Sequence, residues 1–441
     1  MKGAEGHPDW HGIAEGAADP AILEECERRL ASEPNSARLH TERASILFRL
    51  GKHEDALAAC ERAVELAPGE QRPLEYRADV LYTLGRHAEA LEGFRRAVGL
   101  SDGDPVVHNN VAATLIALGR HEEALEACKM ATSIDRGYIM SHKNRALALQ
   151  RLGRHAESIE ACAEAIAINP ADADAYKAKS AALNALGSHT DALVALDRAL
   201  SLDPHDAASH FNKGASLLEL RRHAEAAEAF GRSSRLNPGD ILALKNWAGA
   251  LGNIGRHGEA RPLFERILEM RPGDEHAHYG LGQISLGKKN FDDALRSFDC
   301  ALESDPAYAN AHVGRAHALL GLQRPGEALE ACRLAIGYGT PDSEPHRLRG
   351  VALLLMQRYD EAIVAFDGAA RMDPHNPAPL NSKGAALFAL RRSWRYSPVP
   401  PRGGCTGWSG PARRHRLRRR QLSRPASGNG WGPVPTRPRK F

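Results

Sequence analysis

LGRHAEA, residues 84–90, is the stretch that decides the fold, because close copies of it recur at a fixed interval along the chain. LGRHEEA begins at Leu118, LGRHAES at Leu152 and LRRHAEA at Leu220. The residues equivalent to Ala90, which we call anchor positions, are each 34 residues apart: Ala56, Ala90, Ala124, Ser158, Ala192, Ala226, Ala260, Ala294, Ala328 and Ala362. A constant period of this length indicates a solenoid of stacked units, each of which packs only on its neighbours.

Each unit is predicted to be a pair of helices. Nine residues before the anchor, the position is leucine in nine of the ten units, and twelve before it is always Ala, Ser or Gly. Positions three apart share one face of a helix, and the small residues let a second helix approach closely. A glycine such as Gly85 breaks the chain between the two helices, and a proline such as Pro170 ends the second. The sequence therefore predicts an all-α fold.

The same columns resemble the tetratricopeptide repeat (TPR) family, whose 34-residue unit carries Gly, Ala, Phe and Pro at fixed positions. In residues 207–240 these positions are filled by Gly214, Ala226, Phe230 and Pro238. The resemblance implies a right-handed superhelical solenoid of helix-turn-helix hairpins. It also implies a protein-interaction role, in which the first helices of the hairpins line a concave groove.

The domain layout follows from the register of the repeats. We expect a TPR array at 18–392, with ten full units at 37–376. A half unit precedes them, and the first helix of an eleventh unit is expected from Pro377 to Leu390. Residues 1–17 are expected to be disordered. The glycine-rich unit at 241–274, which also carries Pro262, is predicted to be the least stable and to divide the array into two blocks.

The tail at 393–441 departs from the repeat. It holds twelve Lys or Arg and no acid, so the remainder has 46 basic and 55 acidic residues and a net charge of −9, although the whole chain carries +3. Three interpretations are open: a disordered Pro/Gly/Arg-rich tail, a product of a frameshift, or a basic arm that binds nucleic acid around Arg418, Arg419 and Arg420.

Two histidine columns are interpreted as packing sites of the repeat. Equivalent positions in stacked units lie roughly 10 Å apart, which is too far for one metal ion to gather ligands from several units. The cysteines that alternate with phenylalanine four residues after the anchor are interpreted as buried structural thiols in a reducing compartment. We therefore predict neither a metal site nor a cofactor. The histidines three and sixteen before the anchors are His53, His87, His121, His155, His189, His223 and His257, and His40, His108, His142, His210, His278, His312 and His346.

The candidate binding residues form a column fourteen before the anchor, where asparagine recurs. An asparagine amide donates and accepts at once, so a ladder of them matches a peptide backbone. A similar asparagine ladder binds extended peptides in the TPR superhelix of O-linked N-acetylglucosamine transferases. Lysines in the next column are expected to favour acidic partners. The predicted groove residues are Asn110, Asn144, Asn212, Asn246, Lys143, Lys177 and Lys245.

The function predicted is a non-enzymatic scaffold or adaptor that holds an extended protein segment. Residues 282–289, GQISLGKK, approach a phosphate-binding loop, but Lys289 replaces its hydroxyl residue. The alternatives are the targeting region of a larger enzyme, for example a glycosyltransferase, and nucleic-acid binding through the tail. No signal peptide and no apolar run of membrane-spanning length is seen, so a cytoplasmic protein is expected. Self-association through Leu387, Phe388 and Leu390 is also expected.

Overall fold

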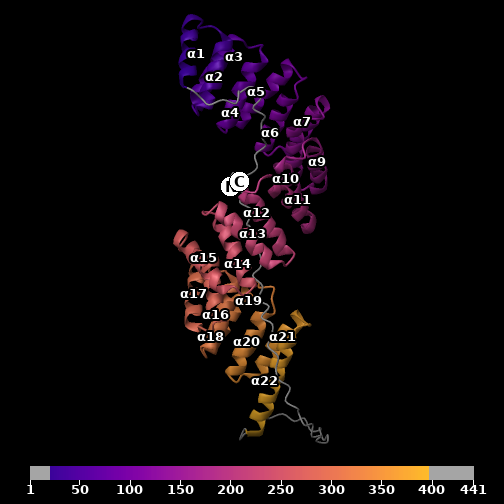
Figure 1. Ribbon diagram of the computed structural model, residues 1–441. Helices are drawn as coiled ribbons and strands as arrows, with labels where there is room; N and C mark the ends of the chain where they lie inside the picture. Colours follow the sequence, from indigo (N-terminus) through magenta and orange to yellow (C-terminus); the bar gives the residue numbers. More distant parts are fainter. Residues whose placement is uncertain (1–19, 397–441) are drawn as a thin grey trace. The chain divides into compact units, whose positions relative to one another are not determined.

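The computed structural model describes residues 20–396, and their side chains as far as Arg391. Within this range the chain is built from α-helices and short turns, and no β-strand occurs (Figure 1). It divides into two compact units between Leu220 and Arg221. In each unit every helix packs on the next one along the chain, and first helices of successive hairpins also touch, as α6 touches α8 and α14 touches α16. Each unit is therefore a helical-repeat solenoid, as predicted.

The first unit contains twelve helices within its described residues. They are α1 (Pro20–Ser32), α2 (Ala37–Arg49), α3 (His53–Leu66), α4 (Gln71–Thr83), α5 (His87–Leu100), α6 (Pro105–Ala117), α7 (His121–Ile134), α8 (Ile139–Arg151), α9 (His155–Ile168), α10 (Ala173–Ala185), α11 (His189–Leu202) and α12 (Ala207–Glu219).

The second unit contains ten helices within its described residues. They are α13 (His223–Leu236), α14 (Ile241–Asn253), α15 (His257–Met270), α16 (Glu275–Gly287), α17 (Phe291–Ser304), α18 (Ala309–Gly321), α19 (Pro325–Gly337), α20 (Glu344–Leu355), α21 (Tyr359–Met372) and α22 (Pro377–Tyr396).

Aspartate caps start many of the first helices. The carboxylate of Asp172 accepts hydrogen bonds from the backbone N–H groups of Asp174 and Ala175 at the start of α10. Asp206 does the same for Ser209 in α12, and Asp274 for Ala277 in α16. Such caps satisfy N–H groups that have no partner inside the helix, and each contributes roughly 1 kcal/mol.

The turn inside each hairpin needs a left-handed residue. Gly85, between α4 and α5, has φ of 77°. In the equivalent place, later units use Arg221, Lys289, Gln323 and Gln357, with φ between 56° and 61°. This conformation costs a non-glycine residue roughly 1–2 kcal/mol, so packing of the hairpin holds the turn where the sequence lacks glycine.

The core runs along the array between the two helices of each hairpin. The anchor residues are completely buried, and so is the column four residues later, where Phe94 is 0 % and Cys60 1 % exposed. Burial of a phenylalanine side chain stabilises the fold by roughly 1.5–3 kcal/mol. The prediction that cysteine substitutes for phenylalanine as a core residue is confirmed for Cys26, Cys60, Cys128, Cys162 and Cys332.

The chain divides into its compact units one repeat before the glycine-rich residues 241–274, whose low stability stays a prediction. The division lies between Leu220 and Arg221, in the turn that follows α12 and precedes α13. In that glycine-rich repeat α14 is regular from Ile241 to Asn253, and α15 continues through Pro262. A proline near a helix start removes a single backbone donor, so the helix tolerates it at limited cost.

At the C-terminal end, α22 runs to Tyr396, six residues past the end predicted at Leu390. Its Leu380 and Leu387 are 53 % and 47 % exposed. Self-association through this helix stays a prediction, and residues 397–441 lie outside the described part of the chain. Over residues 20–396, every helix is too short or too polar to cross a lipid bilayer.

Candidate peptide-binding face

The predicted asparagine column lies on the first helices, but three of its four members are buried. Asn110, Asn144 and Asn246 are 3 %, 2 % and 7 % exposed, and Asn212 is half-buried. The amide of Asn246 donates to the carbonyl of Leu242 in its own helix at 2.9 Å. The column therefore contributes to packing as well as to the surface of the face.

Two of these asparagines join successive first helices. The Asn144 amide, on α8, donates to the side-chain oxygen of Asn109, on α6, at 2.8 Å. The Asn110 amide donates to Asp79, on α4, at 3.4 Å. Asn109 was missed in the sequence analysis, because no other repeat has an asparagine fifteen residues before its anchor. Asn109 does directly precede Asn110, which was predicted. A chain of polar side chains thus crosses three neighbouring helices.

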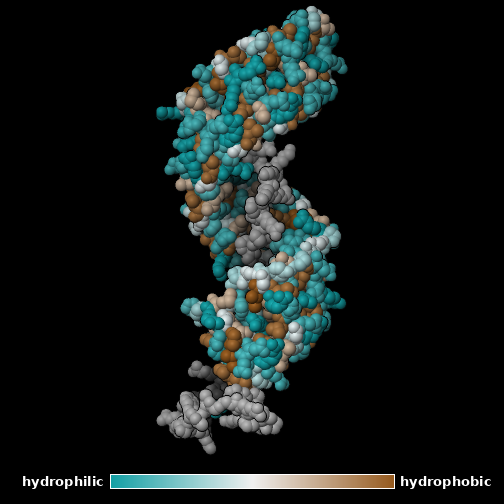
Figure 2. Space-filling view, turned by 180° about the vertical axis from the view of Figure 1, so that it is seen from behind, coloured by the Kyte–Doolittle hydropathy of each residue, from teal (hydrophilic) through white to brown (hydrophobic). Residues whose placement is uncertain are grey.

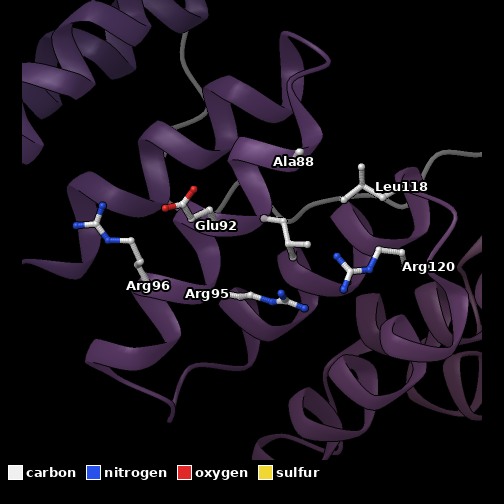
Figure 3. Close-up of a pocket in the computed structure, with 7 residues that line it drawn as sticks. Ala88, Glu92, Arg95, Arg96, Leu118 and Arg120 are labelled. Atoms are coloured by element: carbon white, nitrogen blue, oxygen red, sulfur yellow. The ribbon is translucent and has the colours of Figure 1, made fainter.

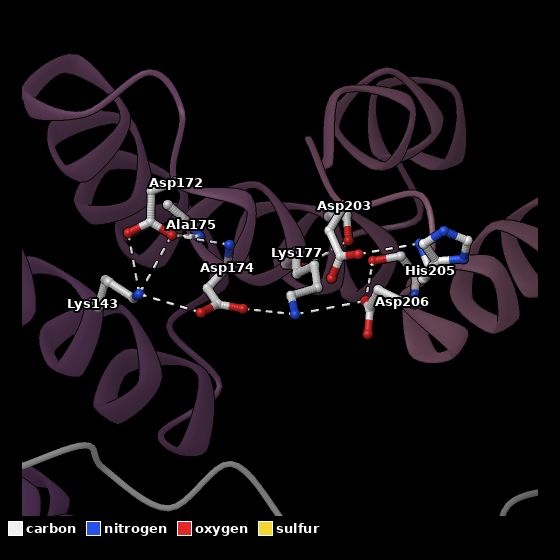
Figure 4. Close-up of polar contacts among 10 residues, drawn as sticks. Lys143, Asp172, Asp174, Ala175, Lys177, Asp203, His205 and Asp206 are labelled. Atoms are coloured by element: carbon white, nitrogen blue, oxygen red, sulfur yellow. Dashed lines mark hydrogen bonds and ion pairs between the residues drawn. The ribbon is translucent and has the colours of Figure 1, made fainter. Parts of the chain in front are cut away.

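The lysine column continues this chain in the first unit (Figure 4). The Lys143 ammonium, on α8, lies 3.1 Å from Asp172 and 3.5 Å from Asp174. Lys177, on α10, lies 2.6 Å from Asp174 and 3.6 Å from Asp206. Asp172 and Asp206 are also helix caps, so each lysine connects one first helix to the start of the next.

The pairing compensates the lysine charges. Burial by itself would lower the pKa of Lys177, but the hydrogen bond and charge of Asp174, with the charge of Asp206, raise it overall. The same contact lowers the pKa of Asp174 against the effect of its burial. Because the positive charges are already neutralised within the chain, the expected attraction of acidic partners does not follow from Lys143 and Lys177.

In the second unit, Lys245 of α14 makes the corresponding contact, 2.6 Å from Asp274. Asp274, Glu275 and His276 place three potential metal ligand atoms within 4.8 Å of one another. The Lys245 ammonium already supplies the positive charge at this group and repels a cation. Burial and the charge of Lys245 also lower the pKa of His276. We therefore assign these residues to helix capping and ion pairing.

The histidine column sixteen before the anchor has a structural role that the sequence did not reveal. In six of its seven histidines, all except His346, Nε2 lies close to a backbone carbonyl six residues earlier, in the loop that leads into the first helix. Since a carbonyl only accepts, Nε2 carries the proton and donates. The pairs are His40–Pro34 (3.0 Å), His108–Asp102 (3.0 Å), His142–Arg136 (3.0 Å), His210–Pro204 (3.1 Å), His278–Pro272 (2.9 Å) and His312–Pro306 (2.9 Å).

The other histidine column begins the second helices, as predicted. His53 packs edge-on against Phe48 with ring centroids 5.0 Å apart, and His87 packs against Tyr82 at 4.9 Å. His189 instead pairs with Asn184 at 3.1 Å through Nδ1. These contacts join the starts of α3, α5 and α11 to the ends of the preceding helices, and all seven histidines of the column are partly buried, so the structure supports packing most directly for His53 and His87.

The second helices carry shallow pockets of their own. One, of about 520 Å³, lies between α5 and the start of α7 and is drawn in Figure 3. Arg95, Arg96 and Arg120 surround it with Glu92, but Arg95 and Arg120 both pair with Glu123, at 3.2 and 2.6 Å. The view in Figure 2 shows a mostly hydrophilic surface with hydrophobic residues in small scattered groups.

Comparison with known proteins agrees with this architecture. Two sequence models described as tetratricopeptide repeat match residues 77–139, 143–197, 182–241 and 285–345, and residues 255–299, respectively. A model described as bacterial transcriptional activator domain matches residues 6–104. A search of curated proteins found no match.

The solved structures that resemble this chain include the following three. The anaphase-promoting complex hetero-tetramer Cut9-Hcn1 is 13 % identical over 83 % of this chain and 92 % of that one, with a TM-score of 0.46. Yeast Tom70 is 15 % identical over 85 % and 93 %, with a TM-score of 0.39. A tetratricopeptide repeat protein of Parabacteroides merdae is 17 % identical over 56 % and 98 %, with a TM-score of 0.47. Since the repeat models together match more than half of the sequence, the chain belongs to the tetratricopeptide repeat family.

Proposed function

We propose that this protein is a non-catalytic scaffold or adaptor that holds an extended segment of a partner protein on the face formed by its first helices. The observation that carries the proposal is the series of polar side chains on first helices of the first unit, in which contacts join α4, α6 and α8 as far as Asn144, and α8, α10 and α12 from the adjacent Lys143 onward. It consists of Asp79, Asn110, Asn109, Asn144, Lys143, Asp172, Asp174, Lys177 and Asp206.

An extended peptide presents backbone donors and acceptors at regular intervals, and binds best to a surface that offers both. In the first unit the buried Asn110 and Asn144 hold the helices in register, while the partly exposed Asn212, Lys143 and Lys177 contact the peptide. Lys245 and Asn246 have the equivalent repeat positions in the second unit, but both are buried, with exposures of 9 % and 7 %, so they hold the helices together there. Because the lysines are paired with aspartates, this part of the face is expected to bind the peptide backbone, and its affinity depends less on the charge of the peptide's side chains.

The cysteines support a reducing compartment such as the cytoplasm. Six of the seven belong to the described residues, all six are free thiols, and five are buried. Burial raises the pKa of the Cys60 and Cys128 thiols to about 12, so they remain protonated and unreactive near neutral pH.

Site-specific photo-crosslinking tests the proposal. A photoreactive phenylalanine analogue replaces Asn212 on α12 in the full-length protein, or Val194 on α11 as a control that is 68 % exposed. Irradiation in lysate of the native host is followed by mass spectrometry of the crosslinked peptides. We expect crosslinks from position 212 to a short segment of a partner, competed by a synthetic peptide of that segment.

The double variant Lys143→Ser/Lys177→Ser provides the second arm. It is expected to weaken binding of the identified peptide at least about tenfold, because two contacts of the face are lost. Equal crosslinking from positions 194 and 212, or full affinity in the double variant, would refute a binding site on this face.

A further inference from the structure

The N-terminal end of the same face contains a pocket that differs in charge from the lysine-lined part. It has a volume of about 550 Å³ and lies between α2 and α4, with Ile22 of α1 at its edge. Arg38 and Arg72 stand eighteen residues before successive anchors, and Tyr76 occupies the position that is asparagine in later repeats. The repeat thus places this pocket in register with the candidate peptide-binding face.

Aspartates neutralise the positive charges of Lys143 and Lys177. In this pocket, Arg38 and Arg72 have no such partner within the described residues. Arg38 and Arg72 are exposed, and neither forms an ion pair with any residue at 20–396. A third arginine, Arg49, is half-buried in the same pocket. Two carboxylates also line it: Glu42, which pairs with Arg29 at 3.3 Å, and Glu70. Since Glu42 is engaged by Arg29, Glu70 is the one other carboxylate among the described lining residues, and it does not match the two exposed guanidinium groups of Arg38 and Arg72.

The floor of the pocket is apolar with hydroxyl groups. Ile46 and Tyr76, which are 2 % and 9 % exposed, line it together with Thr41 and Ser45. Burial raises the pKa of the Tyr76 hydroxyl, and the charge of Arg72 and a hydrogen bond with Ser45 oppose this rise. At the rim, Ile22 exposes 44 % of its surface.

We infer that this pocket binds an acidic stretch of a partner peptide, with carboxylates on Arg38 and Arg72 and an apolar side chain against Ile22 and Tyr76. Guanidinium groups suit this role because their planar N–H donors match a carboxylate in a two-bond geometry. The inference rests on the proposed function for the choice of face. It adds a charge preference at the N-terminal end that the paired lysines do not supply.

The test uses a defined probe and the full-length protein. The probe is a fluorescein-labelled, capped peptide of eight residues that alternates glutamate and leucine between Gly-Ser flanks, and the comparison peptide has glutamine for glutamate. Fluorescence anisotropy gives both affinities at low and high salt. We expect the glutamate peptide to bind at least about tenfold more tightly, with an advantage that shrinks at 0.5 M salt because the charges are screened.

The double variant Arg38→Gln/Arg72→Gln is expected to lose this advantage. Its matched control is Arg62→Gln/Arg96→Gln, which removes the same charge from α3 and α5 of the same unit. Circular dichroism checks that both variants melt like the parent. Equal binding of the two peptides by the parent, or an unchanged preference in the Arg38/Arg72 variant, overturns the inference.

Two further measurements distinguish a partner peptide from the chain's own N-terminal segment, and the arginine pocket from the lysine-lined part of the face. Residues 1–19 contain Glu5, Asp9, Glu15 and Asp19. If the glutamate peptide binds only after these four are replaced by Gln or Asn, the pocket binds that segment and the partner-peptide inference fails.

The Lys143→Ser/Lys177→Ser variant is expected to retain the glutamate preference. A loss of preference there would transfer the acidic site to α8 and α10 and would likewise overturn the assignment, while leaving the proposed function intact.

Discussion

The amide of Asn144, on α8, donates a 2.8 Å hydrogen bond to the side chain of Asn109, on α6, 35 residues earlier in the chain. Both side chains are buried, with exposures of 2 % and 0 %. A buried polar pair of this kind stabilises one stacking register of the two repeats, because a shift would separate donor and acceptor in a place that water does not reach.

Replacement of Asn144 by alanine is therefore expected to destabilise the first unit by about 1–2 kcal/mol, since a buried hydrogen bond is lost. Urea unfolding followed by circular dichroism measures this change. Asn212→Ala, at the half-exposed position of the same column, is expected to cost less than about 0.5 kcal/mol. Similar losses in both variants would mean that the Asn144–Asn109 contact contributes nothing specific to stacking.

The histidine-to-carbonyl bond predicts a second local effect. His108→Ala removes the donor to the Asp102 carbonyl, so the loop before α6 should open more often, with a loss of about 1 kcal/mol. Hydrogen exchange of the amides at the start of α6 reports this opening. His205→Ala, at an exposed loop histidine, serves as the control. Unchanged protection in His108→Ala would show that the imidazole acts only by packing.

Close packing of phenylalanine against glycine gives a third prediction. A Cβ added at Gly314, in α18, would overlap the ring of Phe298, whereas one added at Gly326, in α19, meets nothing within 4 Å. Gly314→Ala is expected to destabilise the second unit by about 1–3 kcal/mol, and Gly326→Ala to be neutral or slightly stabilising. The midpoints of urea unfolding of the two variants measure this difference. Equal midpoints would show that the core rearranges to accept the added methyl group at Gly314.

Glu344 gives a pH-dependent prediction for the second unit. Burial alone would raise its pKa, but Arg347 and His317, at 2.5 and 2.8 Å, lower it to about 2. The pKa in the folded state lies below the ordinary value of 4.5, so this stabilisation is complete above about pH 4.5. It is lost as the pH falls from about 4.5 to about 2, and amounts to at most about 3 kcal/mol.

Glu344→Gln should therefore be less stable than the parent at pH 6, and the difference should shrink toward pH 2. Thermal unfolding of the two proteins at several pH values measures it. The control is Glu228→Gln, an exposed glutamate that forms no ion pair within residues 20–396. A difference between Glu344→Gln and the parent that does not change with pH would contradict the ion-pair account.

The sequence by itself determined the repeat, the helices and the core. A hairpin of 34 residues is a local structure, so the spacing of the anchor alanine, the small residue twelve before it and the Cys or Phe four after it suffices to place each helix. Helix starts agree closely, as at His87 and His121, because capping and turn formation also depend on near neighbours in the chain.

The tertiary structure decided how the polar columns are used. The sequence indicated that Asn144 and Lys143 share a face, but not that one is buried against Asn109 and the other paired with Asp172, because these partners come from adjacent repeats. Likewise, Arg38 and Lys177 are both basic residues on first helices, and only the position of neighbouring carboxylates makes one charge available and the other compensated. Electrostatic and hydrogen-bond partners depend on distances of a few ångströms across the stack, and the repeat period alone does not fix such distances.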